Sequence, residues 1–161
     1  MKTYELKDYY LKFVEQETTS FEEDFRKDVY RITEAFLDSV INYGDITALK
    51  EIDYSMVKKL VESENNKSIN YTLHLIALEP YDIIEWISYI DSDDFFEPGR
   101  HYFENEELAE ILKNKDYYNP LTGEDVSQEE FKKLINTVFS VSENFITRYK
   151  IYTSCGDLSN E

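Results

Sequence analysis

The chain has 161 residues, of which 42% are hydrophobic and 16% aromatic, so it is long enough to bury a core, and disorder over its whole length is excluded. Its net charge of −17 opposes direct binding to nucleic acids or anionic membranes, because both present negatively charged phosphates. Four Gly and three Pro are too few for a turn-rich β-sandwich, and the single Cys155 excludes an internal disulfide framework.

Residues 1–44 predict two amphipathic helices. Apolar residues at three- and four-residue steps predict the first helix over residues 4–17. Ser20 followed by Glu23 is a capping-box pattern, which predicts a second helix over about 20–43. Gly44 suits the left-handed position just after its end. The apolar stripe of this second helix comprises Phe21, Phe25, Val29, Ile32, Phe36 and Val40.

Two aspartates and one ambiguous segment follow. Asp45 is placed to cap a short helix through Ile52, and Asp53 is placed to cap the next one. Residues 69–76 fit either a helix or a half-buried strand, because apolar and polar side chains alternate there. We favour the helix, because an isolated strand would leave its backbone hydrogen-bonding groups without partners.

Pro80 suits the first position of a further helix, which would turn the isoleucines after it toward the core. Residues 91–99 are a predicted loop. Asn105 and the two glutamates after it predict the start of a helix that runs through Lys113. Residues 119–125 have the composition of a turn.

The last predicted helix begins with a second capping-box pattern, formed by Ser127 and Glu130. We expect this helix to run over about 127–149. Its apolar face includes Phe131 and Phe145, and it is too long to leave in water. We therefore expect it to pack against the Phe-rich stripe of the second helix.

Together these elements predict a mainly α fold, in which a single acidic domain over residues 1–161 forms a bundle of about six to eight helices. Short β segments are the alternative at 69–76 and at 147–153. The C-terminal tail, residues 154–161, is expected to be mobile.

The stretch from Glu79 to Glu110 concentrates the charge of the chain. Eleven carboxylates face one cation, Arg100, which gives a net charge of −10 within 32 residues. The stretch also contains Trp86 and six other aromatic residues. Such a surface would attract Lys and Arg side chains, and exposed rings add contact area and cation–π interactions. The residues expected to contact a partner are Asp91, Asp93, Asp94, Phe95, Phe96, Glu97, Tyr102, Glu104, Glu106, Glu107 and Glu110.

Two simpler interpretations compete with a partner-binding surface. An excess of one charge also keeps proteins soluble without any partner. In addition, Phe95 and Phe96 would be unavailable for binding if they anchored the loop to the core.

The sequence contains no recognisable motif for catalysis or metal binding. Neither His74 nor His101 has a Glu at the spacing of a di-iron site, and two His with one Cys do not make a standard zinc site. Residues 91–102 depart from the EF-hand pattern, because Phe96 stands where Gly is needed and Tyr102 where Glu is needed. We therefore expect no enzyme activity, catalytic residue, metal or cofactor.

These observations predict a non-enzymatic inhibitor that neutralises a basic, nucleic-acid-binding protein partner and does not itself bind nucleic acid or membranes. Nuclease immunity proteins and phage anti-defence proteins, including anti-restriction and anti-CRISPR proteins, follow this physical logic, and DNA mimicry is one form of it. The alternative is an interaction or immunity module whose partner does not bind nucleic acid. The single cysteine and the absence of an apolar leader in the first ten residues predict a cytoplasmic location.

Overall fold

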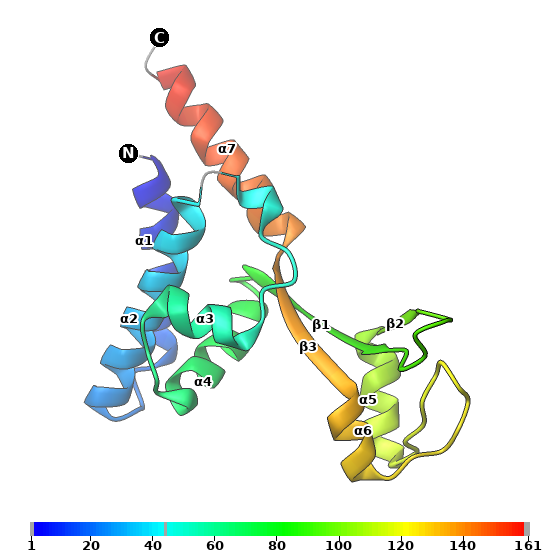
Figure 1. Ribbon diagram of the computed structural model, residues 1–161. Coiled ribbons are helices and arrows are strands. Elements are labelled where there is room, and N and C mark those ends of the chain that lie inside the picture. Colours follow the sequence, from blue (N-terminus) through cyan, green and yellow to red (C-terminus); the bar gives the residue numbers. More distant parts are fainter. Residues whose placement is uncertain (1, 44, 160–161) are drawn as a thin grey trace. The chain divides into compact units, whose positions relative to one another are not determined.

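The computed structural model describes residues 2–43 and 45–159 (Figure 1). Within these ranges lie seven α-helices, one 3₁₀ helix and a small three-stranded antiparallel sheet, and 56% of the chain is helical. The prediction of a mainly α fold with short β segments is therefore confirmed in its outline. The strands, however, lie at other places than the two that were considered.

The chain forms two compact units, which we call unit 1 (residues 1–85 and 139–161) and unit 2 (residues 86–138). The single domain expected over 1–161 stays a prediction. The helices of unit 1 are α1 (Lys2–Glu17), α2 (Glu23–Ile41), η1 (Ile46–Ala48), α3 (Tyr54–Val61), α4 (Asn66–Ala77) and α7 (Glu143–Ser159). The remaining elements are β1 (Ile84–Asp91), β2 (Arg100–Phe103), α5 (Asn105–Asn114), α6 (Gln128–Leu134) and β3 (Ile135–Val141).

Helix α2 is the centre of unit 1. It packs against α1, α3 and α4, and α1 also packs against α7. Phe36 is 1% exposed and lies on a continuous buried face with Val29, Ile32 and Val40. The stripe predicted for this helix is thus correct over most of its length, but Phe21 lies before the helix and is 39% exposed.

The predicted capping box at Ser20 is wrong. The N-cap of α2 is Glu22, which makes no side-chain capping bond. Ser20 instead lies in the turn that ends α1, where the Phe21 amide donates to the Thr18 carbonyl at 3.1 Å. Gly44, expected just beyond α2, lies outside the described residues.

The two predicted aspartate caps are confirmed. Asp53 accepts a hydrogen bond from the Met56 amide at 2.8 Å and begins α3. Asp45 accepts one from the Thr47 amide at 3.1 Å, but the short helix expected through Ile52 is wrong, because the 3₁₀ helix η1 ends at Ala48. The ambiguous segment 69–76 belongs to α4, so the preference for helix there was correct and the strand alternative was not.

The helix predicted after Pro80 is wrong, because the chain forms strand β1 there. Its β-branched and aromatic side chains would lose rotational freedom in a helix, whereas they pack well on a pleated sheet. β1 pairs with β2 on one side and β3 on the other, giving the strand order β2-β1-β3. One of these partners, β3, is distant in sequence, and local periodicity does not reveal such a partner.

The single last helix predicted over 127–149 is also wrong. Ser127 does cap α6, accepting from the Glu130 amide at 3.1 Å, but α6 ends at Leu134 and strand β3 follows. Ser142 then accepts from the Phe145 amide at 3.0 Å at the start of α7. Phe131 and Phe145 consequently belong to different units, and the continuous apolar face does not exist.

Helix α7 runs through Ser159, so the extended alternative at 147–153 is wrong as well. Of the predicted mobile tail, residues 160–161 lie outside the described residues. Arg148 fixes α7 within unit 1, because its Nη1 donates at 3.0 Å each to the Tyr10 hydroxyl and to the carbonyls of Pro80 and Tyr81. One guanidinium thus joins α7 to α1 and to the segment that leads into β1.

Unit 2 has a small core of its own. Ile90 of β1, Phe103 of β2, Ile111 of α5 and Phe131 of α6 are buried together. The elements β1, β2, α5 and α6 therefore contribute one large side chain each, and Figure 1 shows α5 and α6 next to one another. The unit holds its shape with few buried residues, so each of them carries a large share of its stability.

We predict that Phe36→Ala lowers the free energy of unfolding by about 3–5 kcal/mol, because it leaves a cavity beneath the centre of unit 1. Urea unfolding followed by circular dichroism measures this change. Leu78→Ala is the control, since Leu78 is exposed and its loss should stay within about 0.5 kcal/mol. Equal effects of the two substitutions would contradict the assigned core.

A second prediction concerns Tyr81, which is 1% exposed and whose hydroxyl has no hydrogen-bond partner among the described residues. Burial, followed by the charge of Glu17, raises the pKa of this phenol. Tyr81 therefore ionises at a lower pH in the unfolded chain than in the folded chain. The folded state loses stability through this residue as the pH rises above about 10.

Tyr81→Phe should reduce this alkaline loss of stability and leave the stability at pH 7 unchanged or slightly higher, because it removes an unsatisfied hydroxyl. Urea unfolding at pH 7 and in steps above pH 10 measures both effects. A variant that loses as much stability as the parent above pH 10 would show that Tyr81 is not the responsible group.

Candidate partner-binding site

The predicted acidic loop is the tip of a β-hairpin in unit 2. β1 and β2 pair in antiparallel register, with Tyr89 opposite Tyr102 and Asp91 opposite Arg100. The Ser92 amide donates to the Gly99 carbonyl at 2.7 Å, which closes the connecting loop. We call residues 89–102 the acidic hairpin.

Arg100, the one cation between residues 79 and 110, bonds to other residues of this hairpin. Its Nε donates to Asp91 Oδ1 at 2.6 Å and its Nη2 donates to Asp91 Oδ2 at 3.3 Å, a two-point contact. The guanidinium lies 3.9 Å from the Tyr89 ring centroid, and Nη1 donates to the Tyr102 hydroxyl at 3.3 Å. The bond to Asp91, and then that to Tyr102, raise the pKa of Arg100. The base of the hairpin is therefore fixed by its own residues.

The loop itself is shaped by two short side chains. Ser92 Oγ accepts from the Asp94 amide at 3.1 Å, and Asp94 Oδ1 accepts from the Phe96 amide at 2.8 Å. Such bonds from short side chains to the backbone two residues on fix the conformation of the loop. Asp94 thus has a structural task in addition to its charge.

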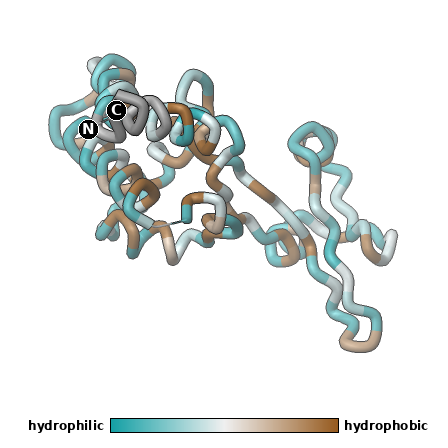
Figure 2. Tube along the Cα trace, turned by 90° about the horizontal axis from the view of Figure 1, so that it is seen from above, coloured by the Kyte–Doolittle hydropathy of each residue, from teal (hydrophilic) through white to brown (hydrophobic). Residues whose placement is uncertain are grey.

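Phe95 and Phe96 are 90% and 89% exposed, so they do not anchor the loop to a core. Their ring centroids lie 5.7 Å apart in an edge-to-face arrangement. Figure 2 shows this apolar tip at the end of a hairpin whose sides are mostly hydrophilic. Two adjacent, almost fully exposed Phe rings are uncommon on a protein surface, since burial of each would be favourable.

A hollow of about 460 Å³ lies between the hairpin loop and the turn over residues 119–125. Asp93, Asp94 and Glu97 of the hairpin loop are among the residues that line it. Asn119, Leu121 and Thr122 of the turn line it as well. The hollow therefore has acidic and neutral oxygen acceptors on its walls and no basic side chain among its lining residues.

The acidic residues of α5 differ in their surroundings. Glu104, Glu106 and Glu110 are exposed, whereas Glu107 accepts a hydrogen bond from the Tyr118 hydroxyl at 3.2 Å. His101 Nε2 lies 3.4 Å from the same Glu107 oxygen. Burial, and then the charge and hydrogen bond of Glu107, raise the pKa of Tyr118. Glu107 is therefore part of the internal structure of unit 2.

The structure thus divides the eleven predicted contact residues. Asp91, Asp94, Tyr102 and Glu107 make hydrogen bonds within unit 2. Of these eleven residues, five are exposed carboxylates that form no side-chain bond or ion pair with any residue that the structure describes: Asp93, Glu97, Glu104, Glu106 and Glu110.

No protein-family model, curated protein or solved structure matches the chain. Among residues 2–43 and 45–159, no group of three or more His, Cys, Asp or Glu side chains could hold a metal ion. No helix in the same residues is long and apolar enough to cross a membrane. The acidic hairpin is therefore interpreted from its own geometry.

The turn over residues 119–125 is the part of this site that the sequence did not assign. Its turn chemistry was recognised, and the Gly123 amide donates to the Asn119 carbonyl at 2.7 Å as such chemistry requires. Its place beside the hairpin loop was not predicted, because the two segments that line the hollow are distant in sequence. The Tyr118–Asp125 bridge closes the turn on itself. In the sequence, the acidic residues in both the hairpin loop and this turn are the one signal that could have pointed to a shared site.

We predict that Phe95→Ser combined with Phe96→Ser changes the free energy of unfolding by less than about 0.5 kcal/mol, because both rings are already in water. Phe103→Ala, in the core of unit 2, should cost about 3–5 kcal/mol. Urea unfolding followed by the fluorescence of Trp86, which lies in unit 2, measures both. A large loss in the double variant would mean that the tip packs inward.

Proposed function

We propose that the protein is a non-enzymatic inhibitor that binds a basic, nucleic-acid-binding protein through the acidic hairpin. The observation that carries this proposal is the set of exposed, unpaired carboxylates at the hairpin loop, Asp93 and Glu97, which flank the exposed pair Phe95 and Phe96 in sequence. An apolar anchor inside a ring of charge has the composition of a binding hot spot with a polar rim.

Charge determines the kind of partner. Unit 2 contains 13 acidic and five basic residues, a net charge of −8 within 53 residues. Such a field attracts a surface rich in Lys and Arg and raises the rate of encounter. Surfaces of this kind are typical of nucleic-acid-binding proteins, because they contact phosphates. Occupation of such a surface would inhibit the partner, as nuclease immunity and phage anti-defence proteins do.

The hollow beside the loop supplies a specific contact for such a partner. Asp93, Asp94 and Glu97 of the hairpin loop can accept hydrogen bonds from a Lys or Arg side chain, and Asn119 and Thr122 offer further oxygens. A cationic side chain that enters the hollow would be partly desolvated, so its interaction would be stronger than that of a pair on the open surface.

The second candidate is an interaction or immunity module whose partner does not bind nucleic acid. The tip itself favours it, since a mimic of DNA needs regularly spaced charge, whereas two exposed Phe rings indicate a partner with an apolar pocket. Both candidates use the same hairpin and differ in what the partner normally binds.

We predict that Asp93→Lys combined with Glu97→Lys lowers the affinity for the natural partner at least about tenfold, because attraction becomes repulsion. Asp94 is left intact, since its carboxylate holds the turn. The matched control is Glu5→Lys with Asp8→Lys on α1, which changes the net charge equally at exposed positions of unit 1. Equal loss in both double variants would assign the effect to net charge alone.

In the first step of the experiment, the immobilised chain captures its partner from a lysate of the source organism. The Asp93/Glu97 double variant is the negative control. The captured protein is then tested for binding to double-stranded DNA and RNA. Displacement of that nucleic acid by the chain, and a steep fall in affinity between about 50 and 200 mM salt, would support the inhibitor. A partner that binds no nucleic acid would support the second candidate.

A further inference from the structure

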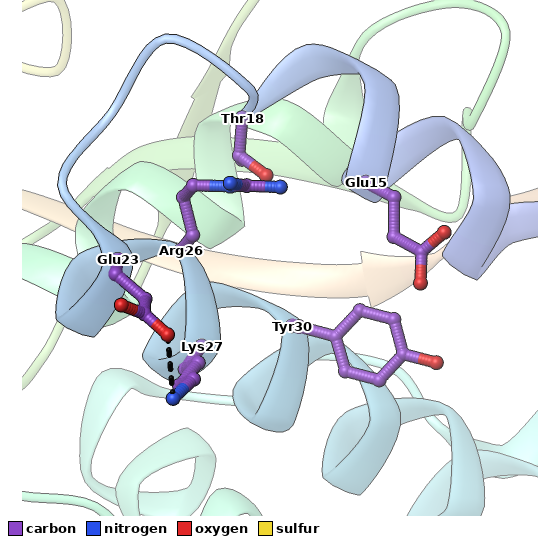
Figure 3. A pocket seen from close by; sticks show the side chains of 6 residues that line it. All are labelled: Glu15, Thr18, Glu23, Arg26, Lys27 and Tyr30. Carbon is purple, nitrogen blue, oxygen red and sulfur yellow. Dashed lines mark ion pairs between the residues drawn. The ribbon is translucent and has the colours of Figure 1, made fainter.

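A second hollow, of about 340 Å³, lies in unit 1 between the end of α1 and the start of α2. Its size falls within the range of small-molecule sites. The residues that line it are Glu15, Thr18, Glu23, Arg26, Lys27 and Tyr30 (Figure 3). None of these residues has a part in the acidic hairpin.

Arg26 is the unusual member of this pocket. Its side chain forms no hydrogen bond or ion pair with any residue that the structure describes, and its Nε is shielded from solvent. A shielded guanidinium N–H without an acceptor is costly, although the chain carries twice as many acidic as basic residues. Lys27, by contrast, is paired with Glu23 at 2.9 Å. Arg26 therefore offers an unused two-point donor for a carboxylate.

Glu15 provides the opposite charge on the other wall. In Figure 3 the Arg26 guanidinium points into the pocket from α2, and the Glu15 carboxylate and the Tyr30 ring lie across the hollow from it. Glu15 has no ion pair among the residues that the structure describes. Burial, and then nearby carboxylates that include Glu15, raise the pKa of Tyr30, which keeps its hydroxyl neutral.

We infer that this pocket binds a small zwitterion that carries a carboxylate and an ammonium group, of which a free amino acid is the simplest kind. The carboxylate pairs with Arg26, and the ammonium pairs with Glu15 and lies near the Tyr30 ring. A plain anion is a poorer ligand, because Glu15 would repel it. A plain cation is poorer as well, because Arg26 would repel it.

The test uses the full chain and the twenty standard L-amino acids, each titrated singly by isothermal calorimetry and by two-dimensional NMR. We expect at least one of them to bind, with shifts at the Arg26 side-chain Nε–H. Its N-acetyl derivative and its carboxamide, which each lack one charge, should bind about tenfold more weakly or worse.

Arg26→Gln and Glu15→Gln should each lower the affinity for the same amino acid by about tenfold or more. Lys12→Gln, at an exposed position of α1 outside the pocket, should keep the affinity within roughly twofold of that of the parent chain. Retained circular dichroism and NMR spectra show that each variant is folded. Binding by none of the twenty amino acids overturns the inference. So does equal binding of the N-acetyl derivative, or unchanged binding in a folded Arg26→Gln variant.

Discussion

Electrostatic repulsion within unit 2 is the constraint on which the rest of that unit depends. Thirteen acidic residues surround a core in which Ile90, Phe103, Ile111 and Phe131 are buried. Like charges this close oppose a compact state, so apolar burial and specific hydrogen bonds have to offset them. The contacts of Arg100 with Asp91 and of Tyr118 with Glu107 have this effect, because each places one carboxylate against a donor.

These internal bonds also decide which charges remain outside. The carboxylates of Asp91 at the base of the hairpin and of Glu107 in α5 are bonded within the unit. Those of Asp93 and Glu97 in the loop, and of Glu104, Glu106 and Glu110, are in water. Charge that is already held by a neighbour contributes little to a partner. The acidic stretch, uniform in the sequence, is therefore divided by the fold into a structural part and an available part.

Most features set by neighbouring residues could be predicted from the sequence, although the capping box expected at Ser20 does not form. Helix α5, the caps at Asp53 and Ser127 and the turn over 119–125 each depend on side chains within a few positions of one another. Strands β1 and β3 could not, because isoleucines spaced for a helix also suit a strand once a distant partner is present. The long helix over 127–149 failed for the same reason, since β-branched residues after Leu134 took part in the sheet.

The exposure of Phe95 and Phe96 could not be predicted either, because a Phe pair in a loop suits inward anchoring as well as outward display. In the structure Asp91 and Arg100 form the last pair of the ladder, the Ser92 and Asp94 side chains fix the loop beyond it, and both rings are exposed. A tip fixed in this way loses little conformational freedom when a partner covers it. The two rings and the carboxylates beside them can therefore contribute most of their contact energy to binding rather than to ordering the loop.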